Sequence, residues 1–124
     1  MSARKPEVDE HLAAADRNLD LARVLLHSVT PPPYDWILII AFYAAVRYVT
    51  AYYFQCFNGG PRDHSDRNGF VNKMLPSVAN AYDQLYSRSR VVRYEVIKSQ
   101  VNERAAKGAI SIAERVRDEI TRLV

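Results

Sequence analysis

The segment Pro61–Arg67, PRDHSDR, places a histidine and an arginine three residues apart where a polar loop enters a predicted helix. A histidine, with an ordinary pKa of about 6.5, can exchange a proton near neutral pH. An arginine one turn further along the same helix face could hold a phosphate beside it. A ribonuclease that works without metal needs these two groups, an acid–base and a cation for the charge of the transition state. We therefore predict His64 and Arg67 as catalytic residues.

This segment also has an ordinary structural interpretation. Histidine and arginine at the start of a helix often serve as a cap and as half of a solvated ion pair. Asp63 and Asp66 are close enough in the sequence to be the partners of such a pair. The sequence keeps both interpretations open.

A second group of cations lies in residues 84–100, which hold four basic residues against one acidic residue. Guanidinium groups beside an aromatic ring suit contacts with phosphates and bases. The alternative is that Arg90 or Arg93 bonds the carbonyls of a helix end, or the carboxylates of Asp35 and Glu95. The residues predicted to bind RNA or phosphate are Arg88, Arg90, Arg93 and Tyr94.

Other kinds of chemistry find no support in the sequence. His11 and His27 lie at opposite ends of one expected helix, His64 lies in another segment, and Cys56 is the only cysteine, so we predict no metal site. The pair Gly59–Gly60 lacks the lysine and the preceding strand of a phosphate-binding loop. An all-helical chain also lacks the strained turn that presents a nucleophilic serine or cysteine. We predict no cofactor.

The composition is that of one globular domain. A chain of 124 residues with 48% hydrophobic residues can bury its own core. The net charge of +3 is modest, whereas nucleic-acid binders usually have a broader basic surface. The charged first ten residues do not resemble a signal peptide, and a single cysteine fits a reducing compartment, so we expect a cytoplasmic protein. We expect residues 1–7 to be a flexible tail and residues 8–124 to be the domain.

The segment Trp36–Phe57 is apolar or aromatic at nearly every position. A helix of this kind is buried in a core, inserted in a membrane or covered by a partner. Arg47 argues against a membrane, because an arginine near the middle of a span costs roughly 2.5 to 3.5 kcal/mol. We predict a buried central helix that also takes part in a homodimer, with no membrane contact.

A helical wheel divides this segment into two arcs. The arc expected to face the interior contains Leu38, Ile39, Ala41, Phe42, Ala45, Val46, Val49, Tyr52, Tyr53 and Cys56. The other arc mixes aromatic and small residues with one arginine, which suits a subunit interface. The alternative is that the first and last helices of the same chain cover it. This second arc contains Trp36, Ile40, Tyr43, Ala44, Arg47, Ala51 and Phe54, and the predicted dimer interface is Trp36, Ile40, Tyr43, Arg47 and Phe54.

Apolar residues recur at helical spacing along the rest of the chain, and no strand pattern occurs. Prolines and glycines separate the helical segments. The pattern predicts an all-α fold, an antiparallel four-helix bundle with one extra short helix. The expected helices cover residues 8–29, 35–57, 64–74 and 77–92, and a last helix that is capped by Ser99 and continues to Leu123.

Several short motifs, in order along the chain, resemble those of HEPN-like proteins of prokaryotes. They are Arg17-Asn18, Asp35-Trp36, Phe42-Tyr43-Ala44-Ala45, His64 with Arg67, Leu85-Tyr86, Ser89-Arg90 and Arg93-Tyr94. The resemblance runs from about residue 10 to the C-terminus. It implies a helical bundle that forms a homodimer.

Many members of this family are metal-independent endoribonucleases of toxin–antitoxin systems or antiviral defence, and others are inactive partners of nucleotidyltransferases. The resemblance therefore implies action on RNA or nucleotide phosphates, or docking to a protein partner encoded nearby, such as a toxin, an antitoxin or a nucleotidyltransferase. The catalytic signature of the family is an arginine followed after four to six residues by a histidine. Arg4 and His11, in the N-terminal region, have this spacing.

Overall fold

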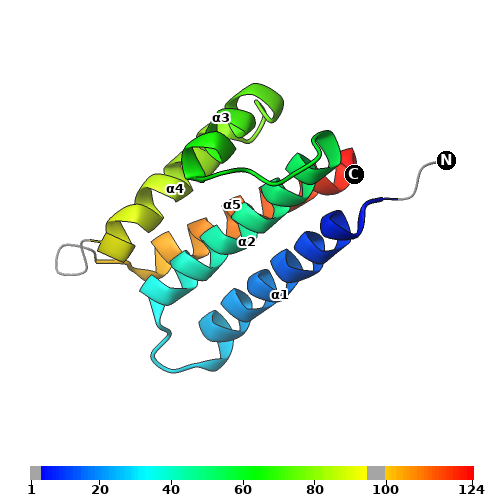
Figure 1. Ribbon diagram of the computed structural model, residues 1–124. Coiled ribbons are helices and arrows are strands. Elements are labelled where there is room, and N and C mark those ends of the chain that lie inside the picture. The colour runs from blue at the N-terminus through cyan, green and yellow to red at the C-terminus, as the bar shows by residue number, and fades with distance from the viewer. Residues whose placement is uncertain (1–3, 95–99) are drawn as a thin grey trace.

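The computed structural model describes residues 4–94 and 100–124. Within these residues the chain is helical and contains no strand, as the sequence predicts. Successive long helices run in opposite directions along one bundle (Figure 1). The five helices are α1 (Pro6–Ser28), α2 (Tyr34–Cys56), α3 (His64–Met74), α4 (Ala79–Tyr94) and α5 (Glu103–Leu123).

Helix α2 forms the centre of the fold and contacts all four other helices. It packs most closely against α1 and α5, and Figure 1 shows α1 on one side of it and α3 and α4 on the other. Helices α2 and α5 run in the same direction, and Gln55 at the end of α2 donates to the carbonyl of Leu123 at the end of α5. These two are the second and fourth long helices, which run in the same direction whenever successive long helices alternate. An apolar surface on nearly every side lets α2 accept neighbours all around it.

The first helix begins two residues earlier than predicted. Proline is well suited to the first turn of a helix, and Pro6 opens α1. Before it, Nζ of Lys5 donates to the backbone carbonyls of Phe54 and Phe57, each at 2.9 Å. Residues 5–7 therefore belong to the folded unit, whereas residues 1–3 lie outside the described part.

The starts of α4 and α5 also differ from the prediction. Residues 76–78 form a turn, so α4 begins at Ala79. The last helix begins at Glu103, and the side chain of Asn102 caps it by accepting a hydrogen bond from Ala105 N at 2.8 Å. Ser99, the predicted cap, lies outside the described residues.

The apolar residues that recur at helical spacing in α1, α4 and α5 face the core, but the wheel of α2 needs correction. Ala44 and Ala51, predicted on the outer arc, are fully buried. They share a row with Tyr48, whose hydroxyl donates to Asp16 of α1, so α1 covers this side. Cys56, predicted inside, is exposed at the end of α2. The outer arc is therefore narrower than a wheel suggests.

Helix α2 is long and apolar enough to cross a membrane, judged by length and composition alone. However, 61% of its most apolar stretch is buried within the protein, as in the core helix of a bundle. The burial includes Phe42 and Val49, both without exposed surface. The other helices thus already cover most of the surface that a membrane would have to cover.

Candidate functional site

His64 and Arg67 form a bonded pair on the first turn of α3. The helix begins here because the Asp63 side chain accepts a hydrogen bond from Asp66 N at 2.8 Å. Nη1 of Arg67 lies 3.1 Å from Nδ1 of His64, and Nε of Arg67 donates to the Thr50 hydroxyl of α2 at 3.2 Å. A guanidinium can only donate, so Nδ1 accepts and the proton of the neutral ring is on Nε2.

The alternative interpretation of this segment was a helix cap and a solvated ion pair. Asp63 is indeed the cap, but Arg67 makes no ion pair with Asp63 or Asp66. Asp63 is the helix cap, and Asp66 accepts from the Tyr53 hydroxyl and from the backbone N–H of Arg62. Among the described residues, no carboxylate lies within ion-pair distance of Arg67. Its positive charge is thus not neutralised by a direct partner there.

The ring of His64 lies in aromatic surroundings. Its centroid is 5.5 Å from that of Tyr86 and 5.9 Å from that of Phe42. Burial lowers the pKa of His64, the charges of Arg67 and Arg93 lower it further, and Asp63 acts weakly in the other direction. His64 is therefore neutral at pH 7 and presents an Nε2–H donor.

Arg93 of α4 supplies the second cation of the site. Its Nε donates to the Ser89 carbonyl at 3.2 Å, one turn earlier, and its Nη1 lies 3.4 Å from the Tyr43 hydroxyl. The guanidinium carbon is 5.3 Å from the ring centre of Phe42 and 5.4 Å from that of Tyr94. Such cation–π contacts orient the guanidinium and leave its charge in place. Arg93 thus makes the predicted helix-carbonyl bond and still faces the site; the alternative partner Glu95 lies outside the described residues.

These side chains surround an open hollow of about 660 Å³ between α3 and the end of α4. Its walls are His64, Tyr86, Arg90, Val91, Arg93 and Tyr94. Tyr94 is 74% exposed, so its ring is available to a ligand. The structure therefore brings His64, Arg90, Arg93 and Tyr94 together around this hollow, and Arg67 adjoins it through its contact with His64.

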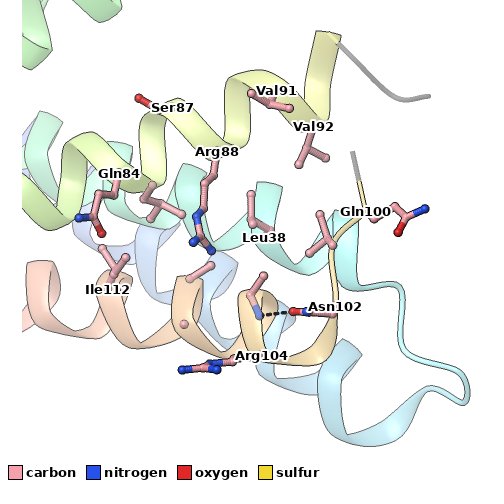
Figure 2. A pocket seen from close by; sticks show the side chains of 15 residues that line it. Leu38, Gln84, Ser87, Arg88, Val91, Val92, Gln100, Asn102, Arg104 and Ile112 are labelled. Carbon is pink, nitrogen blue, oxygen red and sulfur yellow. Dashed lines mark hydrogen bonds between the residues drawn. The ribbon is translucent and has the colours of Figure 1, made fainter. Parts of the chain in front are cut away.

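Arg88, the remaining predicted phosphate ligand, lies on a different face of α4. Figure 2 shows it reaching from α4 toward α5, into a separate open hollow of about 1010 Å³ that Gln84 and Asn102 also line. Residues two apart on a helix do not share a face, which separates Arg88 from Arg90. The structure therefore does not place Arg88 with the other predicted ligands.

The predicted dimer residues follow the outer side of α2. Trp36 is 59% exposed and Tyr43 is 39% exposed, whereas Ile40 is half-buried. Arg47 and Phe54 have a partner within the chain, because Arg47 Nη1 lies 3.0 Å from Nδ1 of His11 and the His11 ring stacks on Phe54 at 5.2 Å. The exposed aromatic surface on this side of α2 is thus Trp36 and Tyr43.

Sequence reasoning missed three parts of the site. Phe42 and Thr50 reach it from α2, where an apolar pattern shows nothing of their contacts with α3 and α4. Tyr86 lies four residues before Arg90, and this helical spacing is a signal that could have identified it. The pair of Arg47 with His11 joins residues 36 positions apart, for which the sequence gives no signal.

The site is made of donors and positive charge. Within residues 4–94 and 100–124, no group of three or more His, Cys, Asp or Glu side chains is arranged to hold a metal ion. Two guanidiniums and an imidazole N–H suit an anion with several acceptor oxygens, and the tyrosine rings suit a planar group beside it. Comparison of the chain with protein families, curated proteins and solved structures finds no match.

Proposed function

We propose that the chain is a cytoplasmic, HEPN-like protein that binds single-stranded RNA through its phosphates. His64, Arg67 and Arg93 contact a phosphate, Arg90 supports it, and Tyr86 and Tyr94 stack on bases. The observation that carries this proposal is that Arg67 donates to a neutral histidine and not to a carboxylate, so that its charge remains available to an anion. The order of the family-like motifs along the chain supports the proposal independently.

RNA fits the site better than an isolated inorganic anion does. An inorganic anion would use the arginines but leave the tyrosine rings without a contact. Stacking of a base on an aromatic ring contributes about 1 to 3 kcal/mol, and a hydrogen bond to a charged group about 1.5 to 3 kcal/mol. A single-stranded nucleotide offers both kinds of contact at once.

The geometry supports binding more directly than cleavage. A general base needs a free lone pair, but Nδ1 of His64 is occupied by Arg67 and Nε2 carries the proton of the neutral ring. In this arrangement His64 donates to a phosphate oxygen. Cleavage would require the ring to leave Arg67, with Arg67 turning to the phosphate.

The binding test compares wild-type protein with Arg67→Gln by fluorescence anisotropy of a labelled single-stranded RNA in EDTA. Loss of one charged contact should weaken binding by roughly tenfold or more and make the log–log salt dependence shallower by about 0.7. Arg115→Gln is the matched control, because Arg115 is exposed on α5. Equal effects of the two variants would refute the proposal.

The same samples test for cleavage on a denaturing gel. If the wild type shortens RNA in EDTA and His64→Ala does not, His64 acts as acid–base and the function extends to an endoribonuclease. If both leave the RNA intact, the protein is a binding module. Cleavage that is equal in the two samples would remove His64 from any catalytic role.

We also propose that the chain forms a homodimer through the outer side of α2. Trp36 and Tyr43 are exposed, whereas the other aromatic side chains of α2 are buried or half-buried; this exposure supports the contact, with Ile40 beside them. Since Arg47 and Phe54 pair with His11, the proposal rests on Trp36, Ile40 and Tyr43, of which Tyr43 also contacts Arg93 through its hydroxyl. Sedimentation equilibrium should give a dimer for the wild type and a monomer for Trp36→Ala with Tyr43→Ala; a wild-type monomer at high concentration contradicts it.

A non-catalytic docking module for a protein encoded nearby is the second candidate, and the same exposed aromatic residues favour it. The two functions differ in their response to substitutions on α4. Arg90→Gln with Arg93→Gln should reduce RNA binding under the first function. Under the second, this double variant has no effect, and Trp36→Ala abolishes copurification of the partner from the host.

A further inference from the structure

A second pair of histidine and arginine lies beside the first, between α1 and α2. Nη1 of Arg47 lies 3.0 Å from Nδ1 of His11, in the same arrangement as Arg67 and His64. The His11 ring stacks on Phe54, with centroids 5.2 Å apart and planes 20° apart. Since the guanidinium donates, Nδ1 of His11 accepts and its Nε2 carries the proton.

This second pair also presents donors and charge to its surroundings. Arg47 is exposed, and no carboxylate of the described chain is within ion-pair distance of it. Burial lowers the pKa of His11 and Arg47 lowers it further, with a smaller contribution from Arg67, while Glu10 and Glu7 act in the opposite direction. The charge of Arg67 therefore reaches His11 as well as His64.

The two pairs are connected across one face of α2. Arg47 and Thr50 lie one turn apart on this helix, and Arg67 donates to the Thr50 hydroxyl at 3.2 Å. The hydrogen-bond donors thus lie in the order His64, Arg67, Arg47 and His11 across this face of α2. Helix α1 makes no contact with α3 or α4 within the described chain, which leaves this face of α2 between them (Figure 1).

We propose that His11 and Arg47 form a second phosphate subsite next to the one at His64 and Arg67, so that the ligand is an RNA strand with at least two consecutive phosphates and not a mononucleotide. This inference rests on the phosphate-binding function proposed above. The two subsites define a path for the RNA across the protein, from the hollow between α3 and α4 toward the first half of α1. Glu10 borders the second subsite and opposes the bound charge.

Titrations with uridine 5′-monophosphate and with an eight-residue oligouridylate separate the two subsites. The imidazole Cε1–H signals of His11 and His64 can be followed by NMR, and affinities come from the same titrations. The mononucleotide should shift the His64 signal first, whereas the oligonucleotide should shift both signals. Arg47→Gln should leave mononucleotide binding unchanged and weaken oligonucleotide binding about tenfold, with a salt dependence shallower by about 0.7.

Two further variants distinguish the loss of a phosphate contact from a change in the packing of the helices. Arg47→Lys keeps the charge and should retain most of the oligonucleotide affinity. Glu10→Gln removes an opposing charge and should strengthen oligonucleotide binding, which a role in helix packing alone would not produce. Circular dichroism of each variant reports whether it folds.

The outcomes distinguish failure of the second subsite from failure of the function. If Arg67→Gln weakens both ligands but Arg47→Gln weakens neither, the second subsite is wrong and the proposed function stands. If Arg47→Gln weakens both ligands equally, there is one site and the inference is also overturned. If Arg67→Gln changes neither affinity, the proposed function itself is wrong.

Discussion

Mild acid should destabilise the protein through its two paired histidines. His11 and His64 each accept a hydrogen bond from an arginine, and burial together with the nearby guanidinium charges lowers both pKa values. Folding therefore favours the neutral rings. In the unfolded chain both rings return to an ordinary pKa of about 6.5 and can take up protons.

The sign and the size of the effect follow from this difference. Below pH 6.5 the unfolded state binds protons that the folded state does not, so the free energy of unfolding falls as the pH falls. The slope is at most about 1.4 kcal/mol per pH unit for each histidine, or about 2.8 kcal/mol per pH unit for both. Because both rings are partly exposed, screening by solvent keeps the actual loss well below this limit. Above pH 6.5 the contribution is complete.

Urea unfolding followed by circular dichroism, from pH 7.5 to 5.0, measures this slope. The carboxylates of Asp66 and Glu119 also have lowered pKa values, so their contributions are lost only at more acidic pH. His11→Gln and His64→Gln should each flatten the dependence between pH 6.5 and 5. His27→Gln, at an exposed position of α1, is the control. Identical slopes for the wild type and all three variants, or a gain of stability on acidification, would refute the reasoning.

Three further substitutions test contacts that position the site. Lys5→Met removes two charged hydrogen bonds at the end of α2 and should cost about 1 kcal/mol in urea unfolding; a loss no larger than that of Arg4→Gln, whose ion pair is exposed, would contradict this. Asp63→Ala removes the cap of α3 and should cost about 0.5 to 2 kcal/mol and also weaken RNA binding, whereas Asp63→Asn should lose much less of both. Tyr48→Phe should lower the free energy of unfolding by about 1 kcal/mol in thermal denaturation, because the carboxylate of Asp16 loses its donor while the ring still fills its space; an unchanged melting temperature would count against the contact.

The sequence was sufficient to predict the helices, because their signals are local. Apolar spacing identified the buried faces of α1 and α4, including Leu19 and Leu85. The parallel contact between α2 and α5 was not predictable in the same way. A helix that is apolar nearly all round does not show which neighbour covers which side, and so the burial of Ala44 and Ala51 by α1 was missed.

For the candidate site, too, the sequence predicted contacts between residues that are close in the chain but not contacts between distant residues. The spacing of His64 and Arg67 is one helical turn, so the sequence predicted that they share a helix face, although not that Arg67 bonds to His64. Arg88 was grouped with Arg90 because they are close in the sequence, although a helix turns them to different faces. Arg4 and His11 have the spacing of the family signature, but Arg4 pairs with Asp9 and His11 pairs with Arg47.

The shortness of α3 affects how the site can move. This helix of eleven residues buries only Phe70 and Val71, and it contacts only α2 and α4 within the described chain. Such a weakly anchored element can detach locally, while the amides of α2 exchange with solvent only when the whole protein opens. His64 and Arg67 therefore lie on a short helix with few buried residues, beside the largely buried α2. A bound RNA that contacts both α3 and α2 should slow amide exchange in α3 far more than in any other helix.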